Sequence, residues 1–289
     1  SQKKIRIMKT ISVIGLGLIG GSFALALKKV GVAEKIIGID KDVKHQIEAL
    51  ELGIVDEIAE LDEALKQSDL VVVAVPINSI QNVLPEILDK INDKTIVMDM
   101  GSTKAGICKK VLNHPKRKQF VATHPIAGTE NSGPKAAFPE LFLNKVVILC
   151  DVDKSEKDAV KKVKKIYQSL WMNVSTMTSE AHDAHIAYVS HLSHITSFAL
   201  GQTVLEEEKN EEAIFDMAGS GFESTVRLAK SSPDMWTPIL IQNRENLLNA
   251  IDAYQTQLSK IRKMIDEKDS EKIHHYLKNT NDIRRILNK

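Results

Sequence analysis

Cysteine is scarce in this sequence, and long apolar runs are missing. The 289 residues include two cysteines, Cys108 and Cys150, which lie far apart and outside any C-x-x-C motif. This usage excludes a disulfide framework and indicates buried thiols in a reducing compartment. No apolar run approaches the roughly 18 residues of a membrane-spanning helix, and the basic start at residues 1–7 lacks the apolar segment of a signal peptide. We therefore expect a cytoplasmic protein.

An excess of charge of either sign is also missing. Lysine and arginine number 39 against 38 aspartates and glutamates, for a net charge of +1. This balance gives no electrostatic argument for nucleic acid as a partner. Small anionic substrates remain compatible with it, because a site needs only local positive charge. The length suggests two domains, with a core that needs no disulfide or metal to hold it.

The first part of the chain alternates between strand-like and helix-like segments. Strands are predicted at residues 10–15, 35–40, 70–76, 95–100, 120–124 and 145–150. The run at 70–76 is continuously apolar, as expected of a strand buried on both faces. Because helical patterns lie between most of these strands, the sequence predicts an α/β fold with a doubly wound, mostly parallel sheet.

Beyond about residue 173 the pattern becomes helical, with no convincing strand. Helices are predicted over residues 182–208, 236–265 and 270–287. In the first of them, apolar residues recur at helical spacing, at Ile186, Val189, Ile195 and Phe198. The expected domains are 8–175 and an all-α domain, 176–289. Helices this long and apolar favour burial against a second copy, so we expect a homodimer through the helical domain; a self-contained bundle is the alternative.

A glycine-rich loop follows the first predicted strand. Gly15, Gly17 and Gly20 fit G-x-G-x-x-G between a strand and a helix, the context that this motif requires. The first glycine permits a tight turn, the second lets the backbone approach a pyrophosphate, and the third lets helix and strand pack closely. The anion would rest at the start of the helix, beside Leu18 and Ile19. A glycine turn without a ligand is the alternative.

An acidic residue stands where such a loop needs one. Asp40 ends the second predicted strand, 20 residues after Gly20. A carboxylate there accepts hydrogen bonds from ribose hydroxyls and repels a 2′-phosphate, which favours NAD over NADP. Lys41 follows directly and keeps NADP open as an alternative. Together with the glycine loop, Asp40 predicts a Rossmann-type domain that binds NAD.

Further candidates lie just past the predicted strands. Ligands of open α/β sheets bind beyond the carboxyl ends of the strands. Val75 and Pro76, then Gly101 and Ser102, and finally His124 are therefore expected to face one crevice. Val75, Pro76 and Gly101 are candidates for cofactor contacts, although Pro76 is equally suited to ending its strand.

Several segments carry a resemblance to a known family. They are GLGLIGGS at 15–22, GSTK at 101–104, HPIAGTE at 124–130, HLSH at 191–194 and GFESTVRLAK at 221–230. In this order and spacing they resemble the prephenate dehydrogenase family, from about residue 9 to the end of the chain. The resemblance implies oxidative decarboxylation of prephenate to 4-hydroxyphenylpyruvate in tyrosine biosynthesis, with NAD as hydride acceptor. Arogenate, which would give L-tyrosine directly, is the open alternative.

The resemblance also implies roles for individual residues. His124 matches the catalytic histidine, and a neutral imidazole is suited to accept the hydroxyl proton of the substrate near neutral pH. Ser102 matches a serine that bonds the reacting hydroxyl and this histidine; from the sequence alone it is also a candidate helix N-cap. Arg227 matches the arginine that holds the substrate side-chain carboxylate, with a surface salt bridge as the alternative.

Four more residues complete the implied substrate site. His194 matches a pocket histidine of the helical domain, and Glu130 an acidic residue at the pocket mouth; Thr129 and Trp236 are expected to support them. One departure is Ser224, which stands where related sequences often have an aspartate, three residues before Arg227. An ionic pairing of that aspartate therefore cannot be carried over. If tyrosine inhibits the enzyme, we expect it to bind at the active site.

Other functions compete with this interpretation. His182, His185, His191 and His194 form two H-x-x-H pairs that are able to hold a metal, but H-E-x-x-H is absent and no metal is expected. A 3-hydroxy acid or 6-phosphogluconate type of dehydrogenase shares this domain order but generally works through a helical lysine. A non-catalytic NAD sensor or a dimeric scaffold is the alternative from another class, and it predicts that His124 is dispensable.

Overall fold

The computed structural model describes residues 7–209 and 212–287 of the chain. The basic start at residues 1–6, for which we expect no signal peptide, lies outside the described residues. The chain has two compact units, Ser1–Asn243 and Arg244–Lys289. No helix in the described parts is long and apolar enough to cross a membrane.

An eight-stranded sheet organises the first unit, with the strand order β3-β2-β1-β4-β5-β6-β7-β8. The strands are β1 Met8–Ile14, β2 Ala33–Ile39, β3 Glu57–Ile58, β4 Leu70–Val73, β5 Ile96–Asp99, β6 Phe120–Pro125, β7 Val146–Cys150 and β8 Asn173–Met177. All neighbouring strands pair in parallel except β6 and β7, which are antiparallel. The predicted doubly wound, mostly parallel sheet is confirmed, and its first six strands follow the Rossmann order.

Two strands escaped prediction because they carry little apolar signal. β3 has two residues, and β8 is a half-exposed edge strand of sequence NVSTM. The predicted strand at 70–76 is shorter in the structure, since Pro76 is the N-cap of α4 and the preceding residues turn toward it. Proline has no backbone N–H to donate to a neighbouring strand.

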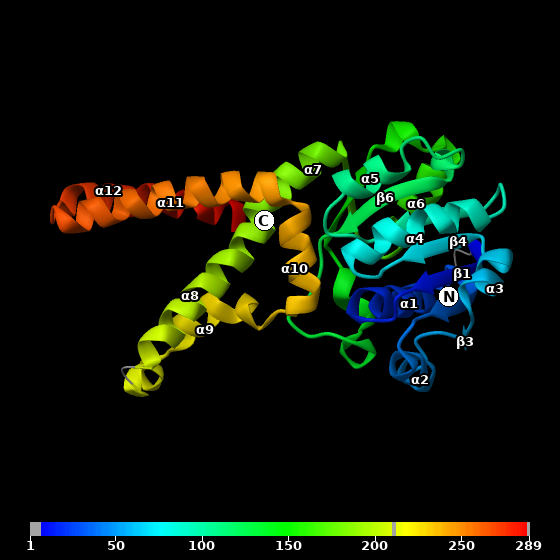
Figure 1. Ribbon diagram of the computed structural model, residues 1–289, viewed down its shortest axis with the longest axis horizontal. Coiled ribbons are helices and arrows are strands. Elements are labelled where there is room, and N and C mark those ends of the chain that lie inside the picture. The colour runs from blue at the N-terminus through cyan, green and yellow to red at the C-terminus, as the bar shows by residue number, and fades with distance from the viewer. Residues whose placement is uncertain (1–6, 210–211, 288–289) are drawn as a thin grey trace. The chain divides into compact units, whose positions relative to one another are not determined.

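Helices cover both faces of the sheet (Figure 1). They are α1 Leu18–Val30, α2 Val43–Glu51, α3 Leu61–Gln67, α4 Ile77–Lys90, α5 Ala105–Val111 and α6 Lys157–Ser169. Side chains of a strand alternate between its faces: in β4, Leu70 and Val72 join the apolar cluster under α1 and α6. Val71 and Val73 join the cluster under α3, α4 and α5. All four are fully buried, which explains the continuous apolar run.

The rest of the described chain is helical. The first unit continues with α7 Ser179–Ile186, α8 Leu192–Glu208, α9 Ser220–Val226 and α10 Pro233–Gln242, and the second unit holds α11 Arg244–Asp266, α12 Ser270–Thr280 and α13 Arg284–Leu287. Short 3-10 turns connect several of these elements, among them Asn281–Ile283 inside the predicted helix 270–287. The predicted helical second part is confirmed, but β8 ends at Met177 and so overlaps the start predicted for it at residue 176.

Two of the predicted helices are interrupted at polar residues. The run over 182–208 contains a π-helical turn at Ala187–His191. The prediction of one helix over 236–265 is wrong, because the chain breaks at Asn243, whose φ is −102° and ψ 28°. The Asn243 side chain is buried and donates to the Asp183 carbonyl at 2.9 Å and to Nδ1 of His191 at 3.1 Å. The helix thus ends at a residue whose side chain is bonded to α7 and to the π-helical turn.

The buried face of α7 and the π-turn also differs from the predicted apolar stripe. Ile186 is buried, but Val189 is 74% exposed. The residues buried beside Ile186 include His182, Asp183 and His191. Polar side chains occupy this face because, as described next, they bond to one another and to the end of β6.

Candidate active site

The glycine loop joins β1 to α1 at the centre of the sheet. Gly15 has a φ of +92°, a conformation that L side chains rarely adopt, and a Cβ there would lie 2.5 Å from the Ala74 carbonyl oxygen. A Cβ on Gly20 would lie 1.9 Å from the Gly15 carbonyl oxygen. Both glycines therefore allow the tight turn and the close helix–strand approach that the motif predicts.

The middle glycine faces open space. A Cβ on Gly17 would meet nothing within 4 Å, and Gly17 is the N-cap of α1 without a side-chain cap. The first turn of this 13-residue helix, which begins at Leu18 and Ile19, carries no acidic residue. Free amides and the positive end of the helix dipole make this position suited to a pyrophosphate.

Asp40 is fixed at the end of β2 beside this loop. One carboxylate oxygen accepts the Leu16 amide at 2.8 Å, and the other accepts the Asp42 amide at 2.8 Å. Each oxygen keeps a lone pair for a further donor, such as a ribose hydroxyl. The loop and Asp40 together fit the adenosine and pyrophosphate parts of NAD.

The predicted contacts at the next strand ends lie along the same edge. Val75 is half-buried, and its amide nitrogen would be 3.0 Å from a Cβ on Gly15. Pro76 is exposed. The Gly101 amide donates to Asp99 at 2.9 Å, and a Cβ on Gly101 would press on Ile107 and Ile77. The structure thus brings the predicted cofactor residues together at the carboxyl edge of the sheet.

A buried ion pair, for which no role was predicted from the sequence, ties two of these strand ends together. Lys104 and Asp99 are both fully buried and form a salt bridge. The Lys104 ammonium also donates to the carbonyls of Thr123, at 2.6 Å, and Gly101, at 3.1 Å. These bonds offset the desolvation of the charges and lock the loop after β5 against β6. The signal was present, since Lys104 belongs to the GSTK segment.

His124 lies in β6 and is buried, with an exposed fraction of 9%. Its Nδ1 is 2.7 Å from Nε2 of His182, and Nδ1 of His182 is 2.7 Å from Oδ1 of Asp183. Burial first, and then electrostatic interactions with His182, Lys104 and His191, hold the pKa of His124 well below its usual value. His124 is therefore neutral at pH 7 and able to accept a proton.

Ser102 is half-buried in the loop before α5. Its predicted alternative as a helix N-cap is wrong, because Lys104 holds the N-cap position. The start of α5 is instead bound by Asp183, whose carboxylate accepts the amides of Lys104, at 2.8 Å, and Ala105, at 3.0 Å. A carboxylate from another helix replaces the local cap, so the Ser102 hydroxyl is not engaged there.

His194 and Trp236 form a stacked pair. Their ring centroids are 3.5 Å apart with an interplanar angle of 20°, and Nδ1 of His194 bonds the Ser190 carbonyl at 3.0 Å. His191 meets the same indole edge-on at 5.7 Å. Burial lowers the pKa of His194, and it lowers the pKa of His191 to about 4. These rings are neutral at pH 7 and offer an aromatic wall with polar edges.

Arg227 pairs with Glu130, so two predicted site residues from distant parts of the sequence meet. Their atoms are 3.1 Å apart, and the side chains are 52% and 27% exposed. An exposed pair of this kind contributes little stability, which leaves the guanidinium able to exchange Glu130 for another carboxylate. Ser224 bonds back to the Gly221 carbonyl at 3.0 Å. Thr129 accepts the Asn131 amide at 3.1 Å.

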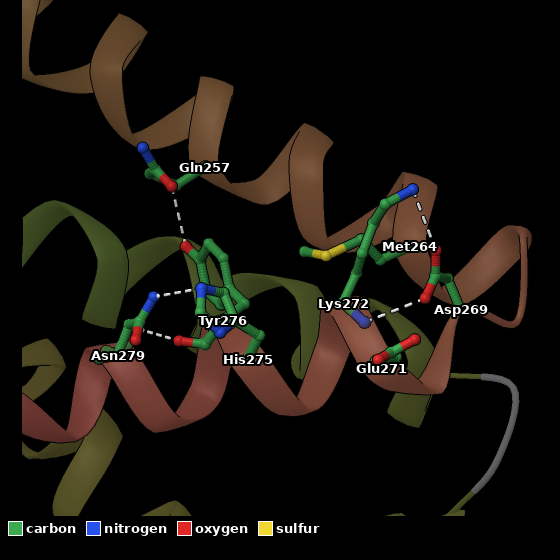
Figure 2. A pocket seen from close by; sticks show the side chains of 9 residues that line it. Gln257, Met264, Asp269, Glu271, Lys272, His275, Tyr276 and Asn279 are labelled. Carbon is green, nitrogen blue, oxygen red and sulfur yellow. Dashed lines mark hydrogen bonds and ion pairs between the residues drawn. The ribbon is translucent and has the colours of Figure 1, made fainter.

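Two other features of the described residues bear on the alternative functions. Among the described residues no group of three or more His, Cys, Asp or Glu side chains is placed to hold a metal ion. His185 is exposed on α7, whereas His182 is buried and bonded to His124. Figure 2 shows an open hollow within the second unit, between α11 and α12, where Tyr276 donates to Gln257 at 2.9 Å. It contains none of the predicted site residues.

Comparison with known proteins agrees with this architecture. Residues 23–175 match the family model of the prephenate dehydrogenase nucleotide-binding domain, and residues 178–279 match that of the prephenate dehydrogenase dimerization domain. The chain is 34% identical to prephenate dehydrogenase of Bacillus subtilis, over 95% of this chain and 75% of that protein. It is 30% identical to cyclohexadienyl dehydrogenase of Zymomonas mobilis, over 97% of each.

A solved structure gives the same result. The crystal structure of prephenate dehydrogenase from Aquifex aeolicus, in complex with hydroxyphenyl propionate and NAD+, superposes with a TM-score of 0.89 at 32% identity. The match covers 98% of this chain and 99% of that one. The two family models together match residues 23–175 and 178–279, which is most of the chain. The chain therefore belongs to the prephenate dehydrogenase family.

Proposed function

We propose that this protein is an NAD-dependent prephenate dehydrogenase, which converts prephenate to 4-hydroxyphenylpyruvate and carbon dioxide on the route to tyrosine. The observation that carries the proposal is His124, which is buried, neutral and bonded through Nδ1 to His182. It lies in β6, and the glycine loop follows β1 of the same sheet. Membership of the family supports the substrate class.

The chemistry needs one base and one hydride acceptor. The substrate hydroxyl gives its proton to the free Nε2 of His124 as the carbinol carbon gives up a hydride, and the carbon–oxygen bond becomes a carbonyl. NAD, when bound, accepts that hydride. The bond between the ring and its carboxylate then breaks, and carbon dioxide leaves. The electron pair of that bond moves through the ring to the carbonyl oxygen, which takes back the proton held by His124 and becomes the phenol hydroxyl. Because the ring becomes aromatic, no covalent nucleophile is required.

The other predicted residues have roles in binding. We assign Ser102 to the reacting hydroxyl and Arg227 to the side-chain carboxylate, for which a planar guanidinium offers two parallel donors. His194 and Trp236 supply the stacked wall. Glu130 holds Arg227 until substrate arrives, and Thr129 belongs to the same turn.

For the cofactor, we assign Gly15, Gly17, Leu18, Ile19 and Gly20 to the pyrophosphate, with Val75, Pro76 and Gly101 beside the nicotinamide. Asp40 receives the ribose hydroxyls and disfavours a 2′-phosphate. Lys41 keeps some use of NADP open, and the ratio of kcat/KM for the two cofactors measures it.

The decisive experiment follows NADH absorbance with purified protein, NAD and either prephenate or arogenate. NADH formation with prephenate supports the proposal, and preference for arogenate redirects it to an arogenate dehydrogenase. No NADH with either substrate, despite measurable NAD binding, contradicts the proposal and favours another substrate or a sensor. Tyrosine added to the same assay is expected to compete with substrate, as binding at the active site requires.

We also propose a homodimer formed through the helical domain, with the functional boundary between residues 175 and 176. The separate family matches at 23–175 and 178–279, the second described as a dimerization domain, support both points. On α11, Leu258 and Ile265 are 49% and 60% exposed, so both side chains are available to pack against a second copy. In sedimentation, Leu258→Glu is expected to shift dimer to monomer, while the control Lys260→Glu keeps the dimer.

A cytoplasmic location completes the proposal. Cys108 and Cys150 are free and buried, and burial raises the pKa of Cys150 to about 12. Unreactive, unpaired thiols are typical of a reducing compartment.

A further inference from the structure

We propose that His182 and Asp183 are positioning residues that set the proton on Nδ1 of His124 and thereby leave Nε2 as the proton acceptor. This inference rests on the proposed function, because it specifies how His124 is prepared for its role as a base. Neither residue was assigned a catalytic part from the sequence, where His182 was considered only as a metal ligand.

Asp183, His182 and His124 form a series of hydrogen bonds, and the direction of each bond follows from Asp183, whose role as an acceptor is fixed. Asp183 is 4% exposed, and its two oxygens already accept the amides of Lys104, at 2.8 Å, and Ala105, at 3.0 Å. Backbone amides donate only, so this carboxylate is held as an acceptor. The group that lies 2.7 Å from its Oδ1 is Nδ1 of His182, which must therefore carry a proton.

The direction of the second hydrogen bond, between His182 and His124, is then determined. With this single proton on Nδ1, His182 presents a bare Nε2, and Nδ1 of His124 lies 2.7 Å from that atom. His124 must donate this bond, so its own proton is on Nδ1. The remaining nitrogen, Nε2, has a lone pair and no hydrogen-bond partner among the described residues.

The surroundings favour this neutral arrangement and also support the proton once it arrives. The charged and titratable groups that face His124 are His182, Lys104 and His191. Lys104 is paired with buried Asp99, and His191 accepts a bond from Asn243. When His124 accepts a proton, its charge is connected through His182 to the Asp183 carboxylate, the role that a buried aspartate performs for a catalytic histidine elsewhere.

The Asp183 carboxylate thus helps to position two parts of the site. Asp183 holds the amides at the start of α5, three residues or fewer after Ser102, and it orients His124 through His182. The serine and the histidine lie at the ends of different strands, yet Asp183 of α7 helps to position both. A purely structural role for His182 would require packing alone, which a side chain of similar size supplies.

The test compares two substitutions at His182 with a matched control. His182→Leu keeps the bulk and removes the acceptor, and we expect kcat to fall by about 10²-fold with an unchanged KM for NAD. His182→Gln places an amide oxygen near the former Nε2 and is expected to retain kcat within about tenfold of the wild type. His185→Leu, on the exposed side of the same helix, is expected to change neither. Full activity of His182→Leu, or equal losses in the Leu and Gln variants, would overturn the proposal.

A spectroscopic readout keeps the inference testable if a variant does not fold. Imidazole ¹⁵N NMR of the unmodified protein at pH 7, assigned by the signal missing from His124→Asn, reports which nitrogen carries the proton. We expect the Nδ1–H form for His124, and an Nε2–H form contradicts the proposal. This measurement needs neither substrate nor turnover, so it stands even where the protein oxidises neither prephenate nor arogenate and the proposed function fails.

Discussion

The sheet and the helical run that follows it bury opposite kinds of residue. In β4 four consecutive aliphatic side chains are fully buried. In α7 and the π-turn the buried residues include His182, Asp183 and His191, while Tyr188 and Val189 are 51% and 74% exposed. The buried aliphatic side chains of the sheet are stabilised by the hydrophobic effect. The buried polar side chains of the helical run are stabilised by hydrogen bonds to one another and to their neighbours. The sheet therefore supplies the apolar core together with His124 on β6, and the helical run supplies the polar partners of that histidine.

Substitution of the proposed base should separate catalysis from stability most clearly. We expect His124→Asn to lower kcat by about 10² to 10⁴-fold, the usual contribution of a general base, while NAD binding and the free energy of unfolding stay close to wild type. Steady-state kinetics and NAD titration measure both. An active His124→Asn variant would contradict the mechanism and favour the sensor alternative.

Arg227 should affect binding more than rate. Loss of its charge-assisted bonds to a carboxylate in Arg227→Ala is expected to raise the KM for prephenate by about 10- to 100-fold with a smaller change in kcat. The exposed Lys230, one helical turn further on, serves as the control, and Lys230→Ala should leave KM nearly unchanged. Equal effects of the two substitutions would show a general electrostatic attraction instead of a specific contact.

The glycine loop allows packing and ligand binding to be separated within one motif. Gly20→Ala is expected to lower the free energy of unfolding by about 1–3 kcal/mol, because its Cβ meets backbone atoms that cannot move away. Gly17→Ala meets no neighbouring atom, so it should preserve stability and raise the KM for NAD. Urea denaturation and NAD titration distinguish the two; a stable Gly20→Ala protein with normal NAD binding would refute the close-packing explanation.

Acid should weaken the polar interior selectively. Burial lowers the pKa of His191 to about 4 in the folded protein, whereas the unfolded chain keeps the usual value near 6.5. Between these two pH values the unfolded chain binds a proton at this residue and the folded protein does not. Stability from this residue is complete above about pH 6.5 and declines as the pH falls toward 4, by about 2 kcal/mol between pH 7 and pH 5. Urea denaturation at the two pH values checks this. His191→Gln should flatten the dependence and exposed His185→Gln should not; identical slopes would contradict it.

The parts of the fold that obey simple patterns were predictable from the sequence. Continuous apolar runs revealed the buried strands, and the glycine spacing with Asp40 revealed the nucleotide-binding loop. The family resemblance, now confirmed, brought Arg227 and Glu130 into one site although 97 residues separate them. Pattern alone would not have joined them, because neither belongs to an apolar periodicity.

Other features depend on contacts that no local pattern encodes. The helix breaks at Asn243, whose side chain bonds to Asp183 and His191, which are distant in sequence. The interior of α7 was predicted from its apolar residues, yet its buried histidine and aspartate are stabilised by partners on β6 and at the start of α5. A polar residue is buried favourably only when its partner is present, and the partner is a property of the tertiary structure.

The π-helical turn at Ala187–His191 sets the angular register of everything downstream on α8. Each residue added to or removed from a helix rotates the following side chains by roughly 100° about its axis. Deleting one residue between Ile186 and Leu192 would leave His182 against β6 but turn His194 away from the indole it stacks on. The π-helical turn thus sets the rotation of His194 about the helix axis relative to His182. Its length, more than its composition, is the property that a homologue or a designed variant must preserve.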